Sequence, residues 1–345
     1  MISEVISTHT PELFASAVER AAKLLRSGEI VALPTETVYG LAANALDAAA
    51  VARVFAVKTR PARNPVIVHV ADIAMAKRCV AEWPASAEAL ARSFWPGPLT
   101  MVLARSDVIP DVVTAGGHTV GVRWPSHPFI QAVIRACGFP LAAPSANLAG
   151  SISPTNAEHV RKGLGEQVPL IVDGGQSQVG IESTVVDLAS PTARVLRPGM
   201  IHEESLAAVL GALEPSPANS EREPATLRSP GLLEKHYAPR ARLVMLNWRN
   251  VADLQFQLAA QGADPGDTQI IAHTTIPAAG AFAGVSVIPH DSEAFARALY
   301  AELHRCDEAG AKWIVIEALP EGPQWRAIAD RLRRASATHE PATRI

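Results

Sequence analysis

The sequence predicts an α/β protein in which a twisted mixed sheet with flanking helices is linked to a second, smaller α/β domain. Segments with helical and strand-like spacing of apolar residues alternate along most of the chain, as is typical of helices packed on a sheet. Between 212 and 240 the sequence is instead rich in Pro, Ser, Glu and Arg, which is the composition of a linker. With 345 residues and 48% hydrophobic side chains, the chain can bury a core in each of two domains.

The first domain repeats a helix followed by a strand. Apolar residues recur at helical spacing over 12–27, Gly28 is placed to end that helix, and the strand EIVAL follows. The same order recurs at 47–57 before PVIVHV and at 127–137 before PLAAP. Other apolar runs predict the strands LTMVLA (99–104), TVGVRW (119–124), PLIVD (169–173), STVVDLA (183–189) and ARVLRP (193–198). Together these segments predict one large mixed sheet.

The second domain is expected to begin near Arg242. Its predicted order is strand (LVML), helix (251–261), strand (TQIIAH), strand (VSVIP), helix (293–309), strand (WIVIEAL) and helix (325–334). We therefore expect a large domain at 1–205, a Pro-rich linker at 206–240 and a small α/β domain at 241–340, with a frayed tail at the end.

Composition argues against several classes of protein. A formal net charge of -3 is unlike that of a protein that grips nucleic acid by bulk electrostatics. The three cysteines, Cys79, Cys137 and Cys306, are far apart in apolar contexts, which predicts core thiols and neither disulfides nor a metal site. The glycine fingerprint of dinucleotide-binding folds and the Walker phosphate loop are both absent. Since no export segment or long apolar run is found, we expect a soluble, cytoplasmic protein with no membrane role.

Four polar clusters stand at the ends of apolar strands: PTETVYGL (34–41), KTRPARNPVIVH (58–69), APSAN (143–147) and GIEST (180–184). Carboxylate and phosphate ligands need charge-assisted donors. One sheet could bring the segments that carry such donors together. The donors are Lys58, Arg60, Asn64, His69, Arg123, Ser145, Asn147 and Arg197. The sequence therefore predicts one site for anions. Metal-ligand spacing of His and Cys is absent, so any metal would be Mg²⁺ brought with a phosphate substrate.

Each cluster also has a purely structural interpretation. Lys58 and Arg60 are equally consistent with cations at the solvated C-terminus of a helix, and a lone strand histidine such as His69 is usually a core or edge residue. Thr35 and Thr37 share a face if their strand continues. They then either grip one small polar ligand or reflect the ordinary β propensity of threonine.

Ser145 and Arg123 leave similar alternatives. Ser145 follows small residues that let backbone N–H groups approach a ligand, and no GxSxG elbow surrounds it. A binding role for Ser145 is therefore more economical than a role as nucleophile. Arg123 lies at the end of an apolar strand, where a guanidinium needs a partner. That partner is either an internal carboxylate, Glu36 or Glu182, or the carboxylate of a ligand held bidentately.

Seven motifs, in this order and spacing, resemble the YrdC-type domain of threonylcarbamoyl-AMP synthases. They are PTETVYGLAANA, KTRPARNPVIVHV, FWPGPLT, VGVRWP, PLAAPSANLAGSISPT, DGG with GIESTVVDL, and VLRPG, over roughly residues 10–205. SPGLLEKHYAPRA followed by a small α/β domain is similar to the longer, two-domain form of that family. The resemblance implies a YrdC-like first domain and a Rossmann-like second domain.

The resemblance also implies a reaction. Members of the family condense L-threonine, bicarbonate or CO₂, and ATP into L-threonylcarbamoyl-adenylate and pyrophosphate, so the chain is expected to be a nucleotidyltransferase. The product would pass to a tRNA threonylcarbamoyl transferase complex that modifies the adenosine beside the anticodon. We expect Mg²⁺ to enter with ATP, no organic cofactor, and contact with tRNA that is weak or indirect.

The matching motifs imply roles for individual residues. Those that resemble threonine-binding positions are Thr35, Thr37, His69, Arg123, Ala143 and Ser183, with Arg123 taking the carboxylate. Those that resemble ATP-binding positions are Lys58, Arg60, Asn64, Thr119, Ser145, Asn147, Ser153, Arg197 and Tyr237. Lys58 and Arg60 are the expected catalytic cations, and Lys58 would neutralise phosphate or bicarbonate charge. Tyr237, in the motif HYAP, would make the linker a lid over the nucleotide instead of a plain tether.

Two other functions are weighed against this one. An RNA-binding module without catalysis is disfavoured by the negative net charge and by the lack of interleaved aromatic and basic residues. A carbamoyl-adenylate-forming domain of the hydrogenase-maturation type shares the fold but uses carbamoyl phosphate. The HYAP linker and the absence of acylphosphatase or zinc-finger segments argue against it.

Overall fold

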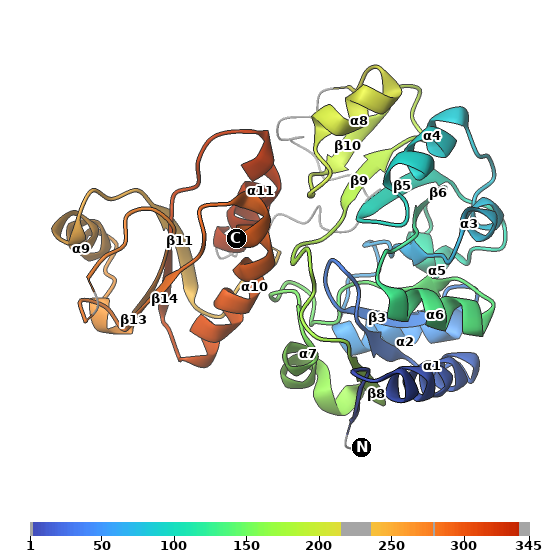
Figure 1. The fold of residues 1–345 in the computed structure, drawn as a ribbon, viewed down its shortest axis with the longest axis horizontal. Coiled ribbons are helices and arrows are strands. Elements are labelled where there is room, and N and C mark those ends of the chain that lie inside the picture. The colour runs from blue at the N-terminus through green and yellow to red at the C-terminus, as the bar shows by residue number, and fades with distance from the viewer. Residues whose placement is uncertain (1–2, 215–235, 279, 338–345) are drawn as a thin grey trace, which may run out of the picture. The chain divides into compact units, whose positions relative to one another are not determined.

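The computed structural model describes residues 3–214, 236–278 and 280–337, and its elements are shown in Figure 1. The chain divides into two compact units. The first comprises Met1–Ala149 and Ser153–Leu232, and the second comprises Gly150–Ile152 and Leu233–Ile345. Most of the predicted linker, at 215–235, and the predicted tail lie outside the described residues.

A mixed sheet of ten strands forms the centre of the first unit, in the order β1-β8-β2-β3-β7-β4-β6-β5-β9-β10. Its strands are β1 (Glu4–Ser7), β2 (Val31–Leu33), β3 (Gly40–Asn44), β4 (Val68–His69), β5 (Leu99–Ala104), β6 (Thr119–Arg123), β7 (Leu141–Ala142), β8 (Leu170–Asp173), β9 (Thr184–Asp187) and β10 (Arg194–Arg197). The pairs β4–β6 and β5–β9 are parallel, whereas β3–β7, β4–β7 and β5–β6 are antiparallel. This arrangement confirms the predicted large mixed sheet.

Helices flank the sheet where apolar residues recur at helical spacing. They are α1 (Pro11–Arg26), α2 (Ala48–Lys58), α3 (Ile73–Cys79), α4 (Ala85–Phe94), α5 (Asp111–Thr114), α6 (Pro128–Cys137), α7 (Ala157–Leu164) and α8 (Glu203–Leu210). The side chain of Thr10 caps α1 by accepting from Leu13 N, and Asp47 caps α2 in the same manner. Helices α1 and α6 lie side by side (Figure 1), and the rings of Phe14 and Phe129 meet edge-on there at 5.2 Å.

Some elements differ from the prediction. The apolar run PVIVHV contributes only Val68–His69 as a strand, because Pro65 has no N–H and Val66 donates instead to Val113 O. Helix α8 continues to Leu210, and Glu214 N donates to Ala193 O, so regular structure in the first unit extends past residue 205.

The second unit is a parallel sheet of four strands in the order β11-β14-β12-β13, with a helix between consecutive strands except between β12 and β13. Its elements are β11 (Arg242–Leu246), α9 (Val251–Ala260), β12 (Thr268–Ala272), β13 (Gly284–Val287), α10 (Ser292–Glu308), β14 (Trp313–Glu317) and α11 (Arg326–Ser336). Parallel strands joined through helices are the Rossmann-like arrangement, and they match the predicted order of elements. The fold class predicted for both domains is therefore confirmed.

The carboxylate of Glu317 holds the loop after β12 in the second unit. It accepts from the backbone N–H groups of His273, Thr274 and Thr275 at 2.7, 2.8 and 2.9 Å. Burial raises the pKa of Glu317, but these three bonds and then His273 outweigh it, so the pKa lies below its ordinary value of 4.5. A lowered pKa in the folded state means that the carboxylate stabilises the fold above about pH 4.5 and loses this effect as the pH falls further.

We expect Glu317→Gln to destabilise the protein by about 2 kcal/mol at pH 7, because charge-assisted bonds become neutral ones. The difference from the unmodified protein should shrink as the pH falls towards 3. Thermal unfolding at a series of pH values measures both effects, with the exposed Glu321→Gln as the control. A constant difference at all pH values would contradict the assignment.

Candidate active site

Lys58 joins two of the polar clusters that the sequence analysis singled out. It is the last residue of α2 and only 1% exposed. Its Nζ donates to the carbonyl oxygens of Ser145 and Asn147, at 2.5 Å each, so the KTR segment is bonded to the APSAN segment. The interpretation of Lys58 as a solvated helix end is therefore wrong.

The electrostatic setting of Lys58 favours an anionic ligand. Burial, and then the nearby Arg60, lower the pKa of Lys58 well below its usual value, while Glu182 opposes them. A phosphate or carboxylate placed against the ammonium would stabilise its charged form.

Arg60 and Asn64 also lie together. Arg60 Nε donates to Asn64 O at 2.9 Å, and Arg60 Nη2 donates to Asn64 Oδ1 at 2.8 Å and to Pro65 O at 2.6 Å. The guanidinium lies over the ring of Phe55, 5.8 Å from its centroid. These contacts fix the KTRPARNP segment as a defined turn after α2.

The APSAN segment runs close to the start of β3. Leu41 N donates to Pro144 O at 2.8 Å, and Gly40 forms an isolated bridge with Ser145. A Cβ atom on Gly40 would lie 3.3 Å from the Cβ of Ala143, so the missing side chain permits this approach. The backbone around Ala143 and Ser145 is held by the sheet itself.

Thr35 and Thr37 lie together for a different reason from the one expected. Residues 34–39 are not a strand, since β2 ends at Leu33 and β3 begins at Gly40. The prediction that the two threonines share one face of a strand is therefore wrong. Thr35 Oγ1 accepts from Thr37 N at 3.2 Å in a turn, and the two hydroxyl oxygens are 2.9 Å apart. Both side chains are buried.

Arg123, at the end of β6, lies at the centre of a buried polar cluster. Its Nη2 is 2.6 Å from Glu36 Oε1, its Nη1 donates to Thr37 Oγ1 at 2.9 Å, and its Nε donates to Gly97 O at 3.2 Å. Of the two internal carboxylates considered, Glu36 is the partner. Glu182 is instead bonded to Ser153 Oγ, which donates to its Oε1 at 2.5 Å.

His69 lies beside Arg123, because β4 and β6 are parallel and the two residues are paired in register. Burial, and then the Arg123 charge, lower the pKa of His69 to about 3. The imidazole is therefore neutral at physiological pH. Its Nδ1 is buried and makes no hydrogen bond within the described part of the chain.

Ser183 and Arg197 form a further pair, at the start of β9 and the end of β10. Arg197 donates from Nε to Ser183 O and from Nη2 to Ser183 Oγ, both at 3.1 Å. The Ser183 hydroxyl also lies 2.8 Å from Thr100 Oγ1. The predicted hydroxyl and cation of GIEST and VLRPG thus occur together.

Gly199 keeps this pair in place. A Cβ at residue 199 would overlap the backbone nitrogen of Thr184 and come within 2.6 Å of its Oγ1. We expect Gly199→Ala to destabilise the protein by about 2 to 3 kcal/mol, measured by chemical denaturation. Gly163→Ala is the matched control, since a Cβ there meets open space in α7, and it should be neutral or slightly stabilising. Equal stability of the two variants would contradict this account.

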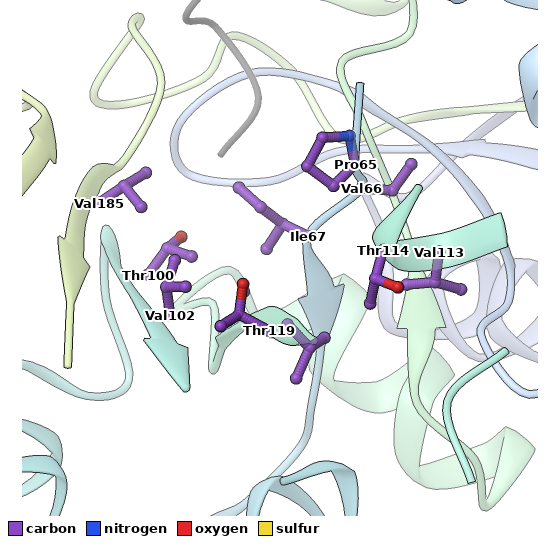
Figure 2. Close-up of a pocket in the computed structure, with 11 residues that line it drawn as sticks. Pro65, Val66, Ile67, Thr100, Val102, Val113, Thr114, Thr119 and Val185 are labelled. Carbon is purple, nitrogen blue, oxygen red and sulfur yellow. The ribbon is translucent and has the colours of Figure 1, made fainter. Parts of the chain in front are cut away.

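An apolar pocket opens beside these polar groups, and Thr119 lines it. Figure 2 shows Thr100 and Thr119 among apolar side chains of β5, β6, β9 and α5 and of the segment just before β4. The complete lining is Pro65, Val66, Ile67, Thr100, Val102, Val113, Thr114, Thr119, Val120, Gly121 and Val185. The hollow is small and mainly apolar, and its hydroxyl groups come from Thr100, Thr114 and Thr119.

Tyr237 belongs to the second unit, where it is fully buried. Its ring stacks on Tyr300 of α10 with centroids 5.9 Å apart, and the guanidinium of Arg331 in α11 lies 5.2 Å from its centroid. Its φ of 63° is strained for a residue other than glycine, so packing against α10 and α11 over-determines this conformation.

Two kinds of feature are missing from the described residues. Within 3–214, 236–278 and 280–337, no group of three or more His, Cys, Asp or Glu side chains could hold a metal ion. None of the helices in those ranges is long and apolar enough to cross a membrane.

Two buried carboxylates are not among the predicted ligand-binding residues. Glu36 and Glu182 were considered only as internal partners of Arg123, although both stand within the polar motifs PTET and GIEST. Their position beside hydroxyl residues in these motifs was the available signal. Their contacts with Arg123 and Ser153 depend on pairing between distant segments, which local patterns do not reveal.

Buried cations, hydroxyls and backbone groups lie together at the sheet and its loops, as is typical of an enzyme site that binds anionic substrates. Two family models match the chain. One described as "Telomere recombination" matches residues 23–199, and one described as "Threonylcarbamoyl-AMP synthase, C-terminal domain" matches 201–337. The chain belongs to the threonylcarbamoyl-AMP synthase family, as the motifs predicted, and is an enzyme of nucleotidyltransferase type.

Individual relatives are similar in sequence to this chain over almost its whole length. Threonylcarbamoyl-AMP synthase of Pyrococcus abyssi is 39% identical over 92% of this chain and 93% of its own length. The Bacillus subtilis protein of the same name is 38% identical over 97% and 96%, respectively. The crystal structure of Pyrococcus abyssi Sua5 complexed with L-threonine superposes with a TM-score of 0.88 at 36% identity, covering 97% of this chain and 98% of that one.

Proposed function

We propose that this chain makes L-threonylcarbamoyl-adenylate from L-threonine, bicarbonate or CO₂, and ATP, with release of pyrophosphate. One observation carries the proposal: buried Arg123 and Lys58 stand at two neighbouring polar clusters of a single sheet. The first cluster suits an amino-acid carboxylate, and the second suits phosphate. The length of the match to relatives named threonylcarbamoyl-AMP synthase supports this substrate pair.

The chemistry requires orientation and charge stabilisation more than a protein nucleophile. The threonine amine forms a bond to the carbon of CO₂ and loses one proton, which gives a carbamate. A carbamate oxygen then bonds to the α-phosphorus of ATP, and the bond from that phosphorus to the bridging oxygen breaks as pyrophosphate leaves. The threonine carboxylate, the carbamate and the phosphates are all anionic, so fixed cations and N–H donors lower the barrier.

On the threonine side, Arg123 would bind the carboxylate with the N–H groups that its protein partners leave over. Thr35, Thr37, His69 and Ser183, with the Ala143 backbone, would surround the rest of the amino acid. Neutral His69 and the hydroxyls suit a short polar side chain, because each can accept or donate one hydrogen bond.

On the nucleotide side, Lys58 and Arg60 would stabilise the phosphates during transfer. The other ATP-binding positions that we propose are Asn64, Thr119, Ser145, Asn147, Ser153, Arg197 and Tyr237. Thr119 lies among apolar side chains of β5, β6 and β9, which would face the base. Mg²⁺ would enter on the ATP phosphates, whose oxygen atoms are the ligands that it prefers.

We also propose that the linker acts as a lid on the nucleotide. Tyr237, the described residue to which this role is given, packs on α10 and α11. The product would pass to a tRNA-modifying transferase in the cytoplasm, and direct contact with tRNA would be weak or indirect.

Pyrophosphate release by the purified protein tests the function. With ATP, Mg²⁺ and bicarbonate, we expect release with L-threonine, much less with L-serine, and none without an amino acid. Release with carbamoyl phosphate in place of threonine and bicarbonate would instead favour the carbamoyl-adenylate activity. Tight tRNA binding without any turnover would favour an RNA-binding module.

A further inference from the structure

Glu36 holds a carboxylate oxygen that the protein does not use. The residue lies in the turn between β2 and β3 and is 3% exposed. Its Oε1 accepts from Ser126 N at 3.0 Å and lies 2.6 Å from Arg123 Nη2. Its Oε2 is buried and makes no hydrogen bond to any residue in the described part of the chain.

A counter-ion for Arg123 alone would not leave that oxygen bare. Arginine and carboxylate groups commonly pair through two parallel hydrogen bonds, which use both oxygens. Here the Nη2 contact is an ion pair that lacks hydrogen-bond alignment. A buried acceptor without a donor is costly, and such groups in native proteins call for a ligand or another explanation.

The carboxyl group is ionised and therefore only accepts hydrogen bonds. Burial raises the pKa of Glu36, but the Arg123 charge and the Ser126 N–H outweigh it, so the pKa lies below its ordinary value. The neighbouring titratable side chains are His69, which burial keeps neutral, and His127, whose pKa burial also lowers. Neither imidazole competes for the free oxygen as a cation.

Arg123 and Glu36 together present both signs of charge to a ligand. A guanidinium has five N–H groups, and contacts with Gly97 O, Thr37 Oγ1 and Glu36 Oε1 occupy at most three of those on Arg123. The remaining N–H groups can bind a carboxylate, and Glu36 Oε2 can bind an N–H donor. A cation and an anion set side by side complement an α-amino acid, which carries a carboxylate and an ammonium on one carbon.

We propose that Glu36 Oε2 binds the α-amino group of the substrate and so selects an α-amino acid over the same acid without its amine. This inference rests on the proposed function. The bound ammonium loses one proton to solvent to become the attacking amine, and a second proton leaves as the bond to the carbon of CO₂ forms. One N–H then remains on the carbamate nitrogen, so the same hydrogen bond can persist. Glu36 is then a binding residue that orients the attacking nitrogen, and it remains ionised throughout.

Binding of two ligands to Glu36→Gln tests this role. The ligands are L-threonine and (R)-3-hydroxybutanoate, which has the same carboxylate, hydroxyl and methyl groups but no amine. Glutamine keeps the size of the side chain and an oxygen for Arg123, but it loses the anionic acceptor. We expect calorimetry on the full chain to show that the affinity for threonine falls about 10- to 100-fold, because one hydrogen bond to a charged group is lost. The affinity for hydroxybutanoate should change by less than about threefold.

Other outcomes would overturn the inference. Equal losses for both ligands would mean that Glu36 acts only by supporting Arg123, and an unchanged threonine affinity would remove Glu36 from the site. Glu158→Gln, which alters an exposed ion pair on α7, is the control and should leave both affinities unchanged.

The unmodified protein provides a second test that does not depend on the folding of the variant. It should bind threonine at least about tenfold more tightly than hydroxybutanoate, and equal affinities would contradict the amine contact. If the folded protein binds no threonine at all, the proposed function itself fails, which is a separate result from equal binding of the two ligands.

Discussion

Lys58→Met is expected to abolish pyrophosphate release, with a fall in turnover of at least about a hundredfold. Methionine matches the length of the lysine stem, so the change removes mainly the ammonium group. That group makes two hydrogen bonds to the APSAN backbone, and bonds of this charged kind contribute about 1.5 to 3 kcal/mol each. We also propose that the ammonium stabilises the negative charge that develops on the phosphate during transfer.

The variant is expected to fold but to lose stability, because the carbonyl oxygens of Ser145 and Asn147 lose their donor. Circular dichroism and chemical denaturation report the fold, and a coupled pyrophosphate assay reports turnover. Lys77→Met is the control, since Lys77 is half exposed and pairs with Glu88 at the surface. Turnover near the normal rate in a folded Lys58→Met protein would remove Lys58 from the catalytic role.

Arg123→Ala is expected to raise the threonine concentration needed for half-maximal turnover by about two orders of magnitude. The guanidinium is our proposed ligand for the threonine carboxylate, and charge-assisted, bidentate contacts are among the stronger ones. The requirement for ATP should change much less, because Arg123 bonds to Glu36, Thr37 and Gly97 and not to the Lys58 cluster.

The same change leaves Glu36 as a buried carboxylate without its cation. We expect a loss of about 3 to 5 kcal/mol in the free energy of unfolding, as for other broken buried pairs. Arg123→Lys keeps the charge and tests the geometry: stability should recover in part, while the threonine requirement stays high. An unchanged threonine requirement in Arg123→Ala would show that the carboxylate binds elsewhere.

Much of the fold could be predicted from hydrophobic spacing. The expected helices at 12–27 and 127–137 correspond to α1 and α6 within one residue at each end, and LTMVLA is β5 as predicted. Helices α3 and α7 were not predicted, because each is only 7 or 8 residues long and carries few large apolar side chains. Their side-chain caps, Asp72 and Asn156, were the local signals that could have revealed them.

The candidate site could be predicted in its composition but not in its contacts. Lys58, Arg60, Ser145 and Asn147 stand out locally, since charged and amide groups at strand or helix ends are easily recognised. The bond from Lys58 to Ser145 joins residues 87 apart in sequence, and the sheet alone creates it. The same holds for Glu36, which lies in the turn between β2 and β3 and meets Arg123 of β6 only in the folded sheet.

The most direct test of the central claim is to identify the products made from ATP, L-threonine and ¹³C-labelled bicarbonate. The account predicts pyrophosphate together with an adenylate whose carbamoyl carbon carries the label and whose amine is that of threonine, seen by mass spectrometry. Labelled carbon should be absent from the adenylate when threonine is omitted. ADP and inorganic phosphate in place of pyrophosphate would contradict the account, because they would place the attack on the γ-phosphorus instead of the α-phosphorus.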